Sequence, residues 1–429
     1  MNRPQGATVG GDVKRLSPLR DFLRTESAGA ILLATSALAA LVWANSPWSD
    51  SYDSLWENRL VLSFAGHSLD LDLRHWVNDG LMAIFFFVVG LEIKRELTNG
   101  HLADKRSAML PAIAALGGMI VPAAVYLAIA GADTPRGWAI PMATDIALAV
   151  GVLSAAGSRV PSSLRAFLLG LAIVDDIGAI IIIAAVYSTG ISVGWLAASV
   201  VGVVLAVLFK TSGVRSTWVY VAIGAIVWLG LLNGGVHPTI AGVVMGLLAP
   251  ASPHRSREYV DSEDLARAGD VEYAMAATTR ARETVSTVEW LQHVLHPWTS
   301  FVIVPVFALA NSGIHLSIDG MRDAVSSPIT WGVFFGLLAG KPIGVLLATR
   351  IAVRSGAADQ PVGAESRQLL GIGSAAGIGF TVAIFITKLA LPSESDQSNA
   401  KLAILAASIL AAVMSSVLLR TGGRRDRVA

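Results

Sequence analysis

The chain of 429 residues contains no cysteine. Disulfides, thiolate-bound metals and cysteine nucleophiles are therefore excluded. Charge is also scarce, because Asp, Glu, Lys and Arg make up only 15% of the residues, against about a quarter in ordinary soluble domains. Hydrophobic residues make up 54%. A soluble protein of this length needs a polar surface that so few charges cannot supply, so the composition indicates a membrane protein.

Long apolar runs take the place of the periodic patterns of soluble proteins. A helix that crosses bilayer hydrocarbon needs roughly 20 apolar residues, and we count about twelve such runs, of which 236–250 is the shortest. The expected spans are residues 27–46, 74–97, 108–131, 138–156, 162–187, 191–209, 216–232, 236–250, 297–313, 327–349, 368–391 and 399–420. The predicted fold class is an all-α integral membrane protein.

Lys and Arg are concentrated in alternate connections between these runs. Basic residues precede the first span, follow every second span and end the chain, whereas the other connections carry almost none. By the positive-inside rule both termini are cytoplasmic, which requires an even number of spans. We expect a cytoplasmic arm at 1–24 in place of a cleaved signal peptide, a membrane domain at 25–420 and a cytoplasmic tail at 421–429. The basic segments flank the membrane, so nothing indicates a nucleic-acid partner.

Two connections are long enough to hold structure of their own. The external loop 47–73 contains "RLVLSFAGHSLDLDL", whose partial alternation on both sides of "AGH" predicts a β-hairpin and the only sheet of the molecule. The cytoplasmic loop 251–290 has charged and Ala-rich stretches. Either a short surface helix or a flexible linker fits that loop.

Four charged residues interrupt the apolar runs. Asp175 and Asp176 are adjacent in the fifth span, Asp145 lies in the fourth and Lys341 in the tenth. Each ionised side chain at bilayer depth costs at least about 2.5–3.5 kcal/mol, so we expect the four to face one another across a polar cavity. The alternative is a salt-bridge cluster that only holds helices together. Three acids exceed one base, however, and adjacent residues differ by about 100° around a helix, so one acid should hold a proton or a cation.

The fourth and eleventh spans both contain helix-breaking residues. Pro141 lies within "WAIPMATDIA", and Gly377 and Gly379 lie within "GIGSAAGIGF". Two interrupted spans in corresponding halves indicate a midplane site between inverted repeats, here spans 3–5 and 10–12. Close helix packing would explain the glycines equally well.

Broken helices expose backbone amides at one end and carbonyls at the other. We expect Asp145 to balance the amide ends and Lys341 the carbonyl ends. Exposed carbonyls, carboxylates and the Thr144 hydroxyl are hard oxygen ligands, which suit Na⁺, Li⁺ or protons better than transition metals.

Seven motifs, spread over residues 20–420, resemble those of the NhaA-type sodium/proton antiporters. The motifs are "NDGLMAIFFFVVGLEIKREL", "MATDIALAVGVL", "LAIVDDIGAI", "GGVHPTIAGV", "HVLHPWTSFVIVPVFALANSGI", "GKPIGV" and "GIGFTVAIFI". The resemblance implies a transporter of the bacterial inner membrane, not an enzyme and without a cofactor. It would exchange cytoplasmic Na⁺ or Li⁺ for external protons, about two per cation, and could dimerise through the hairpin.

The resemblance also implies residue roles. Asp175 and Asp176 would be the central acids that hold Na⁺, with Asp176 the direct ligand and Asp175 the partner of Lys341. Thr144 and Asp145 would lie where the broken helices cross. Whether the protons ride on both aspartates or on Asp176 and Lys341 is left open.

A pH-responsive cluster is implied at the cytoplasmic mouth. Its members would be Glu92, Arg95, Glu96, His293 and His296, although interfacial packing accounts equally well for the two histidines. The chain departs from the family pattern here, because Glu289 and Trp290 replace a usual basic pair and Gln292 a usual acid. The resemblance therefore does not predict the pH threshold of activity for this chain.

Two other protein classes use comparable residues. An intramembrane aspartyl protease pairs acids from two helices, but its Gly-x-Gly-Asp context is absent from the chain. A Na⁺-driven symporter of organic anions would need extra Arg, Asn or Gln at the midplane, and spans 4, 5, 10 and 11 offer almost none.

Overall fold

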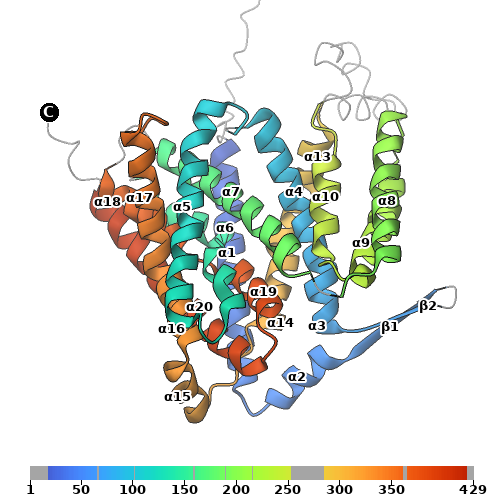
Figure 1. Cartoon of the computed structure of the whole chain (residues 1–429), viewed down its shortest axis with the longest axis horizontal. Helices are drawn as coiled ribbons and strands as arrows, with labels where there is room; N and C mark the ends of the chain where they lie inside the picture. Colours follow the sequence, from blue (N-terminus) through green and yellow to red (C-terminus); the bar gives the residue numbers. More distant parts are fainter. Residues whose placement is uncertain are drawn as a thin grey trace, which may run out of the picture.

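The computed structural model describes residues 18–64, 67–100, 102–157, 160–188, 190–214, 216–252, 285–360 and 365–422. Over these ranges it is a bundle of helices with a single two-stranded sheet (Figure 1). The predicted arm at 1–24, loop at 251–290 and tail at 421–429 fall largely outside the described residues.

The helices of the bundle follow the order of the expected spans. They are α1 (Pro18–Ala44), η1 and α4 (Trp76–Leu81, Met82–Asn99), α5 (Lys105–Ala130), η2 and α6 (Pro135–Met142, Ile146–Ala156), α7 (Ser162–Val186), α8 (Val193–Thr211), α9 (Thr217–Gly234), α10 (Thr239–Leu248), α13, η5 and α14 (Thr287–Trp298, Thr299–Ile303, Val304–Asn311), α16, η6 and α17 (Pro328–Phe335, Gly336–Gly340, Lys341–Arg354), α18 and α19 (Ser366–Ala376, Phe380–Ala390) and α20 (Glu394–Gly422).

Ten of the described helical spans are long and apolar enough to cross a membrane, and the bent pair α18–α19 makes an eleventh. The all-α, multi-pass membrane fold is thereby confirmed. The helix in the expected span 236–250 is α10, which has only ten residues, fewer than the roughly 20 that bilayer hydrocarbon requires. The number twelve therefore stays a prediction.

The ninth span begins earlier than its apolar run. We expected 297–313, whereas α13 starts at Thr287, where the Ser286 hydroxyl accepts a hydrogen bond from the Glu289 amide. Hydropathy misses this first part because Glu289, Gln292 and His293 are polar. Such residues are compatible with a helix end that emerges from the hydrocarbon.

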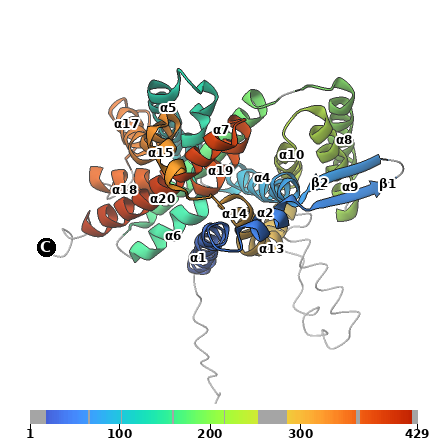
Figure 2. The same ribbon diagram turned by 90° about the horizontal axis from the view of Figure 1, so that it is seen from below.

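The predicted hairpin is present. Strands β1 (Arg59–Phe64) and β2 (His67–Asp72) pair antiparallel, with Arg59 opposite Asp72. Together with α2 (Ser49–Glu57) and α3 (Leu73–His75) it lies at one end of the bundle, which we call the hairpin end, and projects sideways from it (Figure 1). From below, the hairpin lies toward the same side of the bundle as α8 and α9, and α17 and α18 lie toward the opposite side (Figure 2).

Both expected helix interruptions exist. The fourth span is extended at 143–145, between η2 and α6, and the eleventh bends by 51° at 377–379, between α18 and α19. Pro141 lies just before the first break, inside the 3₁₀ helix η2, where it packs against Gly336 of η6. Gly377 and Gly379 lie in the second break itself.

Glycine contacts hold several of these helices close together. Gly117 of α5 meets Gly344 of α17, which joins the third and tenth spans, the first helices of the two expected repeats. On the other side, Gly242 of α10 approaches the Ala83 carbonyl oxygen of α4. Membrane helices associate through small residues because lipid removes the hydrophobic drive between them.

A methyl group at Gly242 should therefore destabilise the bundle. We expect Gly242→Ala to lower the free energy of unfolding by about 1–3 kcal/mol, because backbone atoms of α4 have to move. Gly194→Ala is the matched control: a Cβ there meets nothing within 4 Å. Thermal unfolding in detergent measures both, and equal stability of the two variants would contradict the packing argument.

Candidate functional site

The two helix breaks meet in the interior of the bundle. The Asp145 amide donates to the Ile378 carbonyl oxygen (2.6 Å), so one break bonds directly to the other. The Thr144 hydroxyl lies 2.9 Å from the Ala376 carbonyl oxygen and 2.7 Å from Asp175 Oδ2. Its single proton can serve only one of these acceptors at a time. The fourth, fifth and eleventh spans thus converge here.

Asp145 neutralises two helix N-termini at the crossing. Its Oδ1 accepts from the Leu148 amide in the first turn of α6 (3.1 Å). Its Oδ2 accepts from both the amide (3.1 Å) and the hydroxyl (2.6 Å) of Thr381 in α19. Helix N-termini carry partial positive charge. The buried Asp145 carboxylate therefore lies where it can balance the amide ends of the two broken helices, as expected.

Lys341 lies on the opposite side of the crossing and is completely buried. It follows the π-helical segment η6 directly, and its Nζ lies 2.7 Å from Asp175 Oδ2. The same ammonium donates to the Met142 carbonyl oxygen at the end of η2. Lys341 therefore contacts both an acid and a carbonyl end, as the pattern of charges predicted.

Asp176 faces another way. It is buried on α7, yet it lines a cavity of about 70 Å³ that also receives Asp145, Thr144 and Thr381. No residue that the structure describes forms a hydrogen bond or a close ion pair with its carboxylate. A rotation of about 100° per helical residue explains why adjacent acids have such different surroundings.

Comparison with known proteins gives the family. The family model described as Na⁺/H⁺ antiporter 1 matches residues 20–419. The chain belongs to this family. It is 46% identical over 418 residues to the Na⁺/H⁺ antiporter NhaA 2 of Myxococcus xanthus, with 94% of this chain and 89% of that relative covered. NhaA of Oleidesulfovibrio alaskensis is 43% identical over 425 residues, covering 95% and 94%.

The antiporter-family resemblance that the motifs predicted is thus confirmed, but one geometric expectation is wrong. We expected all four intramembrane charges to face one cavity. Asp145 and Asp176 line it, whereas Asp175 and Lys341 do not. These two form an ion pair with each other instead, and both are buried.

The predicted pH-responsive residues are only partly brought together. Glu92 and His296 line the same cavity as Asp176. Arg95 and Glu96 form an ion pair with 3.3 Å between Arg95 Nη2 and Glu96 Oε1, but neither lines the cavity. His293 is exposed and lies outside the cavity lining. The cavity therefore joins the acid site to part of the predicted mouth.

A cation in this antiporter-family site would draw on oxygen ligands of several kinds. Within the described ranges, no three His, Asp or Glu side chains are grouped to hold a metal. Asp176 would supply a carboxylate, and the Thr144 hydroxyl, backbone carbonyls and water could complete the shell. Hard cations such as Na⁺ accept such oxygen sets.

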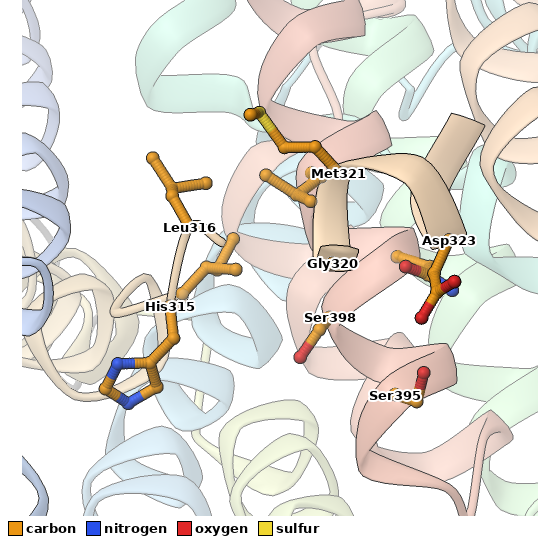
Figure 3. Close-up of a pocket in the computed structure, with 10 residues that line it drawn as sticks. His315, Leu316, Gly320, Met321, Asp323, Ser395 and Ser398 are labelled. Atoms are coloured by element: carbon orange, nitrogen blue, oxygen red, sulfur yellow. The ribbon is translucent and has the colours of Figure 1, made fainter. Parts of the chain in front are cut away.

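Sequence reasoning missed Thr381. Its hydroxyl and amide both bind Asp145, and it lines the cavity. The available signal was its place two residues after Gly379, where a hydroxyl residue can serve the start of the new helix. A second cavity, of about 200 Å³, lies between residues 314–323 and the start of α20 (Figure 3). None of the predicted site residues lines it.

Replacing Thr381 with Val should test its hold on Asp145. Val keeps the shape but removes the hydroxyl donor, so we expect the free energy of unfolding to fall by about 1–2 kcal/mol. Thr381→Ser, which keeps the donor, should retain more of the stability. Thermal unfolding of the purified protein gives the comparison, and a Val variant as stable as wild type would show that the backbone amides position Asp145 without the hydroxyl.

Proposed function

We propose that this protein is a secondary transporter that exchanges Na⁺ or Li⁺ for protons across the membrane, with Asp176 as the shared binding group. One observation carries the proposal. Of Asp145, Asp175 and Asp176, only Asp176 both lines the cavity and has a carboxylate that accepts no hydrogen bond from the described residues. The names of the relatives, all Na⁺/H⁺ antiporters, support the same activity.

Competition at one carboxylate is sufficient to couple the two ions. An ionised Asp176 attracts a cation, and a protonated one does not, so each ion excludes the other. Na⁺ would enter from the cytoplasm through the cavity past Glu92 and His296. Movement of the crossing helices would then expose Asp176 to the other side, where a higher proton concentration displaces Na⁺.

A second proton would make the exchange electrogenic. It would ride on Asp175 or on Lys341, because these two form the ion pair next to Asp176. Exchange of two protons for one cation moves net charge, so the membrane potential can drive it. The alternative role, a pair that only holds helices together, fits the sealed position of Asp175 and Lys341 but does not fit Asp176.

Activity would depend on pH through the cavity mouth. Glu92 and His296 line the path to Asp176, and imidazole titrates near neutral pH. Arg95, Glu96 and His293 would modulate them from outside the cavity. The buried Gln292, which is not ionisable, replaces a usual acid of the family, so the threshold should be this protein's own.

We place the protein in the bacterial cytoplasmic membrane with both termini in the cytoplasm, as the distribution of basic residues supports. A homodimer could form through the hairpin. Within the described residues each strand pairs with another strand along one edge only, and Leu60, Val61 and Leu62 are exposed on β1. Exposed strand edges readily pair with a second copy.

Purified protein in liposomes with a preformed pH gradient tests the proposal. We expect addition of Na⁺ or Li⁺ alone to collapse the gradient, reported by a pH-sensitive dye, and K⁺ or choline to leave it intact. A valinomycin clamp of the membrane potential should change the rate if net charge moves. The absence of Na⁺-dependent proton movement at every pH would overturn the proposal, and a requirement for an organic solute would favour a symporter.

A further inference from the structure

A second set of charged side chains lies at the hairpin end of the bundle. Asp79 belongs to η1, His237 to the connection between α9 and α10, and Lys388 to the last turn of α19. The Asp79 and His237 side chains are only 15% and 11% exposed, and His237 Nε2 lies 3.7 Å from Asp79 Oδ1. The Lys388 charge interacts with those of Asp79 and Asp72. Asp79, His237 and Lys388 do not belong to the site at the helix crossing.

Two spans run from this outer set of charges to the acid cavity. Along each of them a charged residue is followed by phenylalanine and then by residues that line the cavity. Along the second span, Asp79 is followed by Phe85, which lines the cavity, then by Phe86 and then by the deeper cavity residues of α4. Along α19, read from its end, Lys388 is followed by Phe385 and then by Thr381. At about 1.5 Å per helical residue, roughly 10 Å separates each outer charge from the depth of the site.

Aromatic rings fill the space between the two sites. The Phe385 ring centroid lies 5.6 Å from that of Phe86 and 6.3 Å from that of Phe307, and all three side chains are buried. His237 meets Phe385 edge to face at 4.9 Å. In the described conformation, the outer charges are therefore separated from Asp176 by an apolar layer that touches His237 itself.

The His237 ring lies between Thr239 and Asp79. Its Nδ1 lies 2.9 Å from the Thr239 hydroxyl oxygen and 3.4 Å from the Thr239 amide nitrogen, and its Nε2 faces Asp79 Oδ1. The indole Nε1 of Trp228 donates to the Asp79 carbonyl oxygen (2.8 Å) and fixes the backbone. The second carboxylate oxygen of Asp79 makes no hydrogen bond with the described residues.

We propose that Asp79 is a second, outer binding position for the transported cation and that Lys388 is a tethered cation that competes for it; this inference rests on the proposed exchange. A carboxylate oxygen is a hard ligand suited to Na⁺. The Lys388 side chain has a flexible four-carbon stem and a compact charge. When the apolar layer of phenylalanine rings opens, Na⁺ that leaves Asp176 meets Asp79 next. The Lys388 ammonium then helps to displace Na⁺ from Asp79.

The test is a side-resolved transport measurement on two variants that should change in opposite directions. The protein is reconstituted into liposomes in each of its two orientations. The apparent KM is then measured for Na⁺ added on the side of the hairpin end and for Na⁺ added on the side of the other end. Asp79→Asn should raise the hairpin-end KM about tenfold, the range of a lost charge-assisted contact. Lys388→Gln should lower it several-fold because the competing ammonium is gone. The KM from the other end should stay unchanged in both.

Lys401→Gln is the matched control, since Lys401 carries the same charge at the same end and lies on α20. It should not lower the hairpin-end KM if competition at Asp79 is the cause. Equal thermal unfolding temperatures show that each variant is folded. Failure of wild-type exchange would overturn the proposed function itself. Normal wild-type exchange, with both variants unchanged or both shifted in one direction, would overturn only the outer binding position.

Discussion

Replacing Asp176 with Asn should abolish Na⁺-dependent proton movement while leaving the fold intact. Asn has nearly the same shape, but it neither carries the negative charge nor takes up a proton in the relevant pH range. Loss of a charged partner in a buried site typically costs 2–5 kcal/mol of binding, so we expect the Na⁺ response to fall on the order of 100-fold or more. The response is measured as dye-reported collapse of a pH gradient in liposomes.

Stability distinguishes this variant from a merely structural lesion. The Asp176 carboxylate makes no hydrogen bond with the described residues, and burial of an unpaired carboxylate is unfavourable. The unfolding temperature should therefore stay the same or rise slightly. Asp319→Asn, on the surface helix α15 (Ile318–Ser326), is the control for loss of one carboxylate and should keep full exchange. A fully active Asp176→Asn protein would remove Asp176 from the mechanism.

Replacing Lys341 with Met should have the largest effect on stability. The change leaves the Asp175 carboxylate without its 2.7 Å partner and the Met142 carbonyl oxygen without its donor, both inside the bundle. Breaking a buried ion pair from one side costs about 3–5 kcal/mol. We expect a large fall in the unfolding temperature in detergent, with loss of exchange as a consequence.

The double variant Lys341→Met with Asp175→Asn provides the decisive comparison. Removing both charges eliminates the uncompensated carboxylate, so the double variant should recover much of the lost stability. Lys105→Met, an exposed lysine at the start of α5, controls for loss of a positive charge and should unfold like wild type. Additive losses in the double variant would show that Lys341 stabilises the bundle independently of Asp175.

Much of this architecture could be predicted because each feature has a local cause. Apolar run length identifies most spans, alternation around "AGH" identifies the hairpin, and Gly377 and Gly379 mark a helix break. Local signals fail where two influences oppose each other. The polar start of α13 is hidden by its own hydropathy, and α10 covers only ten residues of the apolar run 236–250.

The sequence by itself determined that costly charges lie inside the membrane, that two spans are interrupted, and that Asp175 and Asp176 must point in different directions. Each of these depends on residue type and helical period alone. Only the tertiary structure decided which aspartate is sealed with Lys341 and which lines the cavity, and that Thr381 holds Asp145. Those assignments depend on which face of α7 meets its neighbours. The rotation of α7 about its axis is set by contacts with helices that are distant from it in the sequence.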